Sequence, residues 1–212
     1  MRTVNNCTTL IALLATIFVI GQTPEQENMM KAMQSQVGGD MSLSTAVPLS
    51  DDQLKTLLPK SLAGMELIEV KHGAMSAANM ASIDGVYDTK GEPEFISTDS
   101  GGEKLNPNRR RCNIGVADGA GPTGSNMLMS MKMMSGMAFE SEDENKQQKT
   151  LEVQGIKAQQ VYHKKSNKTE LQFVYLDRFM VSVSATNRNP EETWQLIEHL
   201  DLARLSELVK DN

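Results

Sequence analysis

The sequence predicts an α+β protein with a mostly antiparallel sheet and flanking helices. Three observations predict this fold class. Strand patterns follow one another with only short turns over residues 149–187. Residues 179–185 alternate between apolar side chains on one face and Met180 or serine on the other, which is typical of a strand with one buried face. Helical patterns precede and follow these strands, whereas a doubly wound parallel sheet would bury both faces of its strands.

The sequence pattern of residues 1–21 predicts a signal peptide. Arg2 supplies a positive charge, and an apolar run follows it. This run is shorter than the ~20 apolar residues of a membrane-spanning helix, and the small residues Val19 and Gly21 suit cleavage after Gly21. We therefore expect an exported protein, periplasmic or secreted; the alternative is an inner-membrane anchor formed by residues 8–20.

Residues 22–49 are expected to form a flexible linker, because they are polar and contain two consecutive glycines and a proline. A short helix within this linker would place Met29, Met30 and Met33 on one side. The remaining residues, 50–212, are expected to form a single α+β domain.

The first half of the domain combines helix and strand patterns. Ser50 is expected to cap a helix over residues 51–58, which Pro59 ends. The polar segment 89–110 is expected to form a long loop. Strands are expected at residues 64–73, 78–88 and 112–118, with a short one at 94–97.

The second half begins with a helix expected over residues 124–138, capped by Thr123 or Ser125. An acidic loop is expected at residues 140–145. Strands are then expected at residues 149–155, 156–165, 169–176 and 179–187.

Two helices are expected at the C-terminus. Asn189 has the character of an N-cap, Pro190 suits the first helical position, and Glu192 completes a capping box. Asp201 is expected to cap a second short helix. Their apolar residues recur at helical spacing, so both helices are expected to pack on the sheet.

The net charge and the cysteine content of the chain exclude some classes of function. The net charge of −6 argues against a nucleic-acid binder. Arg109, Arg110 and Arg111 form a local positive run, which is interpreted as a solvated loop or a contact for an acidic partner. Because Cys7 lies in the leader, Cys112 is the only cysteine of the mature chain, and its strand pattern predicts a buried thiol.

The glycine pattern Gly119, Gly121 and Gly124 has the spacing of a dinucleotide-binding turn between a strand and a helix. Such a turn presents backbone N–H groups to a pyrophosphate. Asp118 places a negative charge beside it, and Pro122 removes a donor. We interpret the pattern as a plain strand-to-helix turn; a nucleotide-binding enzyme is an alternative hypothesis.

Methionine is abundant, with 15 copies, and concentrates in the expected helix at residues 127–137. One helical stripe, which is expected to bind the sheet, contains Met127, Met131, Met134 and Ala138. A second stripe contains Met129, Met133 and Met137.

The second stripe has three interpretations. The first is burial within the chain. The second is an intermolecular contact, either a homodimer or another protein, since methionine adapts to varied apolar partners. The third is a copper site, because thioethers suit Cu(I), although the ~12 Å axial span between Met129 and Met137 keeps three sulfurs from one ion.

No nucleophile–base motif, zinc-protease motif or phosphate-binding loop is present in the sequence. We therefore expect no catalytic residue, no cofactor and no metal. The expected function is that of an exported, non-enzymatic domain that contacts a protein or the cell envelope, with membrane contact only through the N-terminal segment. A metal-handling protein that uses the methionines is the first alternative.

Four segments resemble a loose group of uncharacterised exported bacterial proteins: LLPKSLAGMELIEV, NIGVADGAG, DRFMVSVSATN and LDLARLSEL. Such chains look like small α+β domains of the PsbP and Mog1 kind, in which helices flank a sheet. The resemblance implies export and a fold. It implies no activity, because this architecture serves binding and assembly roles as readily as others.

Overall fold

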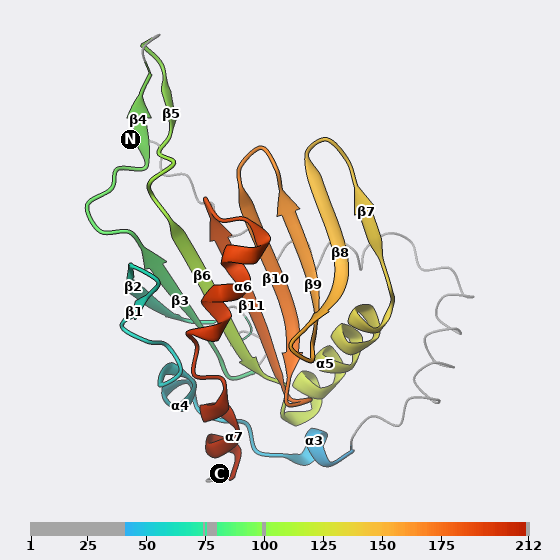
Figure 1. Cartoon of the computed structure of the whole chain (residues 1–212). Helices are drawn as coiled ribbons and strands as arrows, with labels where there is room; N and C mark the ends of the chain where they lie inside the picture. The colour runs from blue at the N-terminus through green and yellow to red at the C-terminus, as the bar shows by residue number, and fades with distance from the viewer. Residues whose placement is uncertain (1–40, 74, 76–79, 99–100, 211–212) are drawn as a thin grey trace. The chain divides into compact units, whose positions relative to one another are not determined.

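The computed structural model describes residues 41–73, 75, 80–98 and 101–210 (Figure 1). The chain divides into two compact units, Met1–Met41 and Ser42–Asn212, and the second unit carries the sheet and its helices. The predicted signal peptide, the alternative anchor and the expected methionine-bearing helix of the linker lie outside the described residues.

A nine-stranded sheet forms the centre of the second unit, and every neighbouring pair of its strands is antiparallel, which confirms the predicted fold class. The strand order is β1-β2-β3-β6-β11-β10-β9-β8-β7 (Figure 1). The bounds are β1 (Ser61–Leu62), β2 (Met65–His72), β3 (Ser82–Asp88), β6 (Arg111–Asp118), β7 (Glu140–Glu142), β8 (Lys146–Val153), β9 (Ile156–His163), β10 (Lys168–Tyr175) and β11 (Phe179–Thr186). A separate hairpin pairs β4 (Phe95–Ser97) with β5 (Glu103–Leu105).

The alternation in β11 produces two different sheet faces. Its odd-numbered residues, such as Val181 and Val183, are buried on the face with the larger core, whereas Ser182 and Ser184 lie on the other face and are half-buried. The turn that joins β10 to β11 holds Leu176 and Asp177 at positive φ, which lets the two strands pair directly.

Three helices contribute to the larger core: α4 (Asp51–Lys55), α6 (Pro190–Glu198) and α7 (Ala203–Lys210). Burial of a leucine or phenylalanine side chain in such a core stabilises a fold by about 1.5–3 kcal/mol. The largest fully buried members of this core include Tyr87, Phe173, Phe179, Leu196 and Leu205.

Three of the predicted helix caps, at Ser50, Asn189 and Asp201, are confirmed. Ser50 and Gln53 form a capping box at α4, and Asn189 and Glu192 form one at α6. The carboxylate of Asp201 accepts a hydrogen bond from the backbone N–H of Arg204 at 3.3 Å in the first turn of α7.

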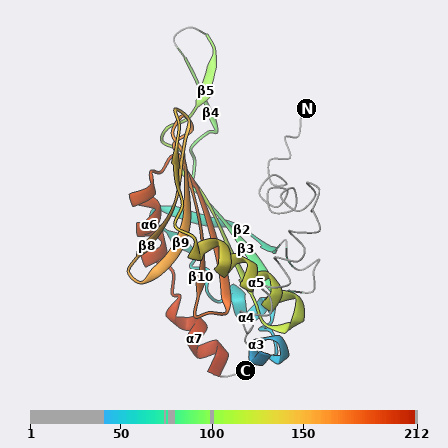
Figure 2. The same cartoon turned by 90° about the vertical axis from the view of Figure 1, so that its right-hand side faces the viewer.

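The opposite face carries α5 (Gly121–Gly136) and a smaller core (Figure 2). This helix begins at Gly121, earlier than expected, and its N-cap is Ala120 without a side-chain hydrogen bond, so the expected Thr123 or Ser125 cap is wrong. The early start is consistent with Pro122, which suits the first positions of a helix.

Several short elements differ from the sequence prediction. Strand β7 replaces the start of the expected acidic loop, β5 lies within the expected 89–110 loop, and α3 (Met41–Thr45) lies within the expected linker. These segments are short and polar, so their patterns carry no periodicity that distinguishes them from loops. No helix within the described ranges is both long and apolar enough to cross a membrane.

Candidate functional site

The C-terminal end of α5 and the residues that follow it expose three large apolar side chains. Met134 is 44% exposed, Met137 is 58% exposed and Phe139 is 50% exposed. We name this group the α5 apolar end. It leads directly into β7, an edge strand of the sheet. Contiguous exposed apolar side chains mark surfaces for contact with another molecule, which makes this group a candidate for such a contact.

Of the four residues predicted to bind α5 to the sheet, two pack against the smaller core and two are exposed. Gly124 and Leu128 are the residues of α5 that are buried, with Met127 and Met131 packed beside Leu128. Met134, assigned to the sheet-facing stripe, is exposed, and so is Ala138. Gly124 lies against the backbone of Gly119 and, with Leu128, forms the buried side of the helix, while Ala138 lies beyond the end of the helix at Gly136.

The second stripe is interrupted by the end of the helix. Met129 and Met133 are half-buried on α5, but Met137 is the C-cap residue and has extended backbone angles (φ −84°, ψ 124°). The three side chains therefore do not continue one helical face. This interruption adds to the ~12 Å axial span as an obstacle to three thioethers around one copper ion.

A different set of methionines meets in the smaller core. Met80 and Met180 are buried there, and three more methionines pack against the same cluster. The cluster also contains aliphatic residues such as Ala117 and Leu128, so its methionines fill space between apolar neighbours. The contributing methionines are Met75, Met80, Met127, Met131 and Met180.

The acidic residues after the α5 apolar end differ in their contacts. Lys164 donates to Glu142 at 2.6 Å, and this hydrogen bond lowers the pKa of the Glu142 carboxyl. The backbone N–H of Asn145, followed by that of Lys146, lowers the pKa of Asp143. The side chains of Glu140 and Glu144 are exposed and form no hydrogen bond or ion pair with the residues that the structure describes.

The glycine turn is organised around a buried carboxylate. Asp118 is 0% exposed and accepts two hydrogen bonds from Arg178, at 2.8 Å from Nε and 2.7 Å from Nη2. Its carboxylate also accepts from the backbone N–H of Leu49 and of Ala120. The sequence places the negative charge of Asp118 beside the turn, and the structure pairs it with Arg178 from the β10–β11 turn.

The glycines of this turn are accounted for by packing. A Cβ at Gly119 would lie 2.6 Å from the carbonyl oxygen of Arg178, and a Cβ at Gly124 would lie 2.7 Å from the carbonyl carbon of Gly119. Gly121 has a φ of +85°, which favours glycine. The spacing that resembles a nucleotide-binding turn thus lets the first turn of α5 pack against Gly119 and lets Gly119 pack against the β10–β11 turn.

The three consecutive arginines do not act as one surface. Arg109 forms a bidentate ion pair with Asp88, and this hydrogen bond raises the pKa of Arg109. Arg110 lies 4.0 Å from Glu192, and Arg111 is exposed at the start of β6. Arg109 therefore ties the loop to the sheet, Arg110 lies near α6, and Arg111 is the most available of the three for an external contact.

Cys112 is fully buried and free, as its strand pattern predicted. Burial raises the pKa of its thiol from the ordinary value of 9.0 to about 12. A thiol that stays protonated is a poor nucleophile and a poor metal ligand. Within the described part of the chain, no group of three or more His, Cys, Asp or Glu side chains could hold a metal ion.

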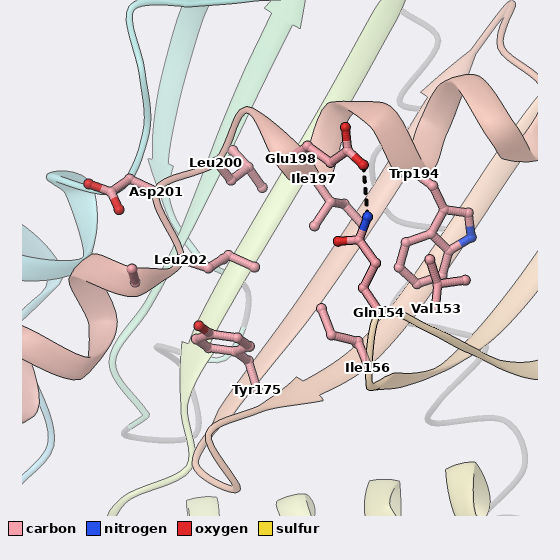
Figure 3. Close-up of a pocket in the computed structure, with 11 residues that line it drawn as sticks. Val153, Gln154, Ile156, Tyr175, Trp194, Ile197, Glu198, Leu200, Asp201 and Leu202 are labelled. Atoms are coloured by element: carbon pink, nitrogen blue, oxygen red, sulfur yellow. Dashed lines mark hydrogen bonds between the residues drawn. The ribbon is translucent and has the colours of Figure 1, made fainter.

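The structure also contains a cavity that the sequence did not reveal. It has a volume of about 350 Å³ and lies between α6, the α6–α7 connection, the β8–β9 turn and the end of β10 (Figure 3). Its walls include Ile156, Tyr175 and Trp194, with Glu198 and Asp201 at its edge. No sequence signal was available, because these residues come from four separate elements and form no local motif.

Comparisons of the chain with protein-family models, curated proteins and solved structures found no match. The resemblance to PsbP and Mog1 architecture accordingly stays a prediction. The α5 apolar end and the cavity beside α6 are the two candidate binding surfaces considered below.

Proposed function

We propose that this chain is an exported, non-enzymatic domain that binds a partner protein through the α5 apolar end. The observation that supports this most is the exposure of Met134, Met137 and Phe139, between 44% and 58% each, within a span of six residues. Methionine suits such a contact because its flexible, polarizable side chain adapts to the shape of an apolar partner.

The neighbouring charges indicate the chemistry of this partner. Glu140 and Glu144 are exposed next to the α5 apolar end. A partner surface with an apolar centre and basic side chains at its rim would complement this arrangement. A symmetric contact between two copies would bring like acidic segments toward each other, which favours a different protein over a second copy.

Export is part of the same proposal. It is supported by the charge and the apolar run of residues 1–21, as a cleavable leader requires. An oxidising compartment would tolerate the single remaining thiol, since Cys112 is buried.

Light scattering after size exclusion tests the contact. The full chain, purified gently from cells that naturally make it, is expected to elute as a complex heavier than its own 23.3 kDa. The variant carrying Met134→Gln and Met137→Gln should lose this complex. Ile68→Gln is the matched control, because Ile68 is 56% exposed on β2 and lies outside the α5 apolar end.

Two outcomes would contradict the proposal. One is a monomer for the natural chain and for both variants. The other is a complex that survives the double substitution but is lost in the Ile68→Gln control. A complex with twice the mass of the chain would show that the partner is a second copy of the chain and not a different protein.

A further inference from the structure

The cavity beside α6 is a half-open depression, lined about equally by polar and apolar atoms and of a size suited to a small ligand. Its volume of about 350 Å³ lies at the lower end of the range for small-molecule sites. Tyr175 and Trp194 contribute aromatic surface, and Ile156 and Leu202 contribute aliphatic surface. Figure 3 shows these side chains directed toward a common space from different elements.

The polar rim of this cavity is negative. Glu198, the last residue of α6, and Asp201 both lie at the edge, and none of the lining residues is basic. The C-terminal end of α6 also carries the negative pole of the helix, with no basic residue in its last turn. The lining charges and the helix end therefore favour a positive ligand group.

The carboxylates of Glu198 and Asp201 differ in their hydrogen-bond partners and in their distance from Trp194. Glu198 accepts a hydrogen bond from the side-chain amide of Gln154 at 3.0 Å, across the cavity edge (Figure 3). Asp201 lies at the far end from Trp194 in the same view and caps α7. Glu198 is consequently the nearer counter-charge for a ligand that contacts Trp194.

We propose that this cavity binds a small organic cation with a short apolar body, such as an alkylammonium ion. The apolar body lies against Ile156, Tyr175 and Leu202, and the cationic group lies at Glu198 beside the C-terminal end of α6. Aromatic faces such as that of Trp194 add favourable contact with alkylammonium groups. This inference is independent of the contact at the α5 apolar end.

Trp194 provides a direct readout, because it is the only tryptophan of the chain and lines the cavity. The experiment titrates the full chain with hexyltrimethylammonium, hexanol and hexanoate while recording tryptophan fluorescence. These probes share the apolar body and differ in charge. We expect a saturable change with the cation, a weaker response to the alcohol and none to the carboxylate.

Conservative variants test the role of the charges. Glu198→Gln keeps an acceptor for Gln154, and Asp201→Asn keeps a good N-cap for α7. Glu198→Gln is expected to weaken binding of the cation by roughly two- to fivefold, the effect of one exposed charge pair, and Asp201→Asn by less. Neither should alter the response to hexanol. Glu191→Gln, on the same helix but outside the cavity, is the matched control and should leave all responses unchanged.

An occlusion variant tests the place of binding. Ala203 lines the cavity and is exposed at the start of α7, so Ala203→Phe should reduce the response to the cation and to hexanol alike. Equal responses to the cation and to hexanoate, or unchanged cation binding in Glu198→Gln, would overturn the inference. So would the absence of a saturable response in the natural chain.

Discussion

Arg178 pairs with Asp118 across 60 residues of sequence, and the carboxylate of this pair is fully buried. The same carboxylate accepts from the N–H of Leu49 before α4 and from that of Ala120 before α5. Arg178 also donates to the carbonyl of Val47 at 2.9 Å. One ion pair therefore joins the entry of the chain into the domain, the glycine turn and the β10–β11 turn.

Substitution of Asp118 by asparagine should strongly destabilise the fold. The new amide NH2 would face N–H donors, and the guanidinium of Arg178 would be left mostly buried without a counter-charge. Breaking a buried pair in this way costs about 3–5 kcal/mol. Urea unfolding followed by circular dichroism measures the change.

The control for this substitution is Asp177→Asn, at the neighbouring turn. The Asp177 side chain is 89% exposed and contacts only Lys132 among the described ion pairs. Its effect should stay within about 0.5 kcal/mol. Equal losses for both variants would mean that the Asp118 pair has no special structural role.

Alanine substitutions at two glycines of α5 should have opposite effects. Gly124→Ala would place a Cβ 2.7 Å from the backbone of Gly119 and should cost about 1–3 kcal/mol. Gly136→Ala enters open space in the last turn and should stabilise the helix by about 0.5–1 kcal/mol. Thermal unfolding of the two variants checks the signs. A neutral Gly124→Ala would show that the glycine is not needed for packing.

The stability of the fold should fall as pH rises above 9. The thiol of Cys112 ionises near its ordinary value of 9.0 in the unfolded chain, but burial raises its pKa to about 12 in the folded chain. Between these values only the unfolded chain releases the proton, so this thiol lowers stability by up to about 1.4 kcal/mol per pH unit.

Urea unfolding at pH 8, 9 and 10 measures this slope. Cys112→Ala should show a shallower decline than the natural chain, because it lacks the buried thiol. Burial also raises the pKa of Tyr87, so part of the decline should remain in the variant. Parallel declines in the two chains would contradict the role of Cys112.

The mature chain should begin at Gln22. The proposed export with cleavage after Gly21 would remove the leader, and intact-mass measurement of the chain from the periplasm or medium would read the new N-terminus. Substitution of Gly21 by a large residue should block cleavage, because the site before the cut accepts small side chains. A full-length chain in the membrane fraction would instead support the anchor at residues 8–20.

Sequence reasoning succeeded where a pattern is local and repeated. The alternation in β11 and the capping box at Asn189 each depend on residues that are close in the chain, so the main strands and the C-terminal helices were predicted. The buried state of Cys112 followed from a second alternation, that of Cys112, Ile114 and Val116 in β6.

Features that depend on contacts between distant segments could not be predicted. The partner of Asp118 is 60 residues away, and nothing in either local pattern indicates Arg178. The buried residues of α5 are Gly124 and Leu128, and the contact of Gly124 with the backbone of Gly119 is not visible in the methionine spacing. The cavity at Trp194 is assembled from four elements and has no sequence signature.

Site-specific photo-crosslinking tests the proposed contact most directly. A photoreactive residue is placed at Met137, or at Ile68 as the control, and the chain is irradiated in cells that naturally make it. The proposal predicts one discrete adduct with another protein from Met137 and none from Ile68. No adduct from Met137, or the same adducts from both positions, would contradict it.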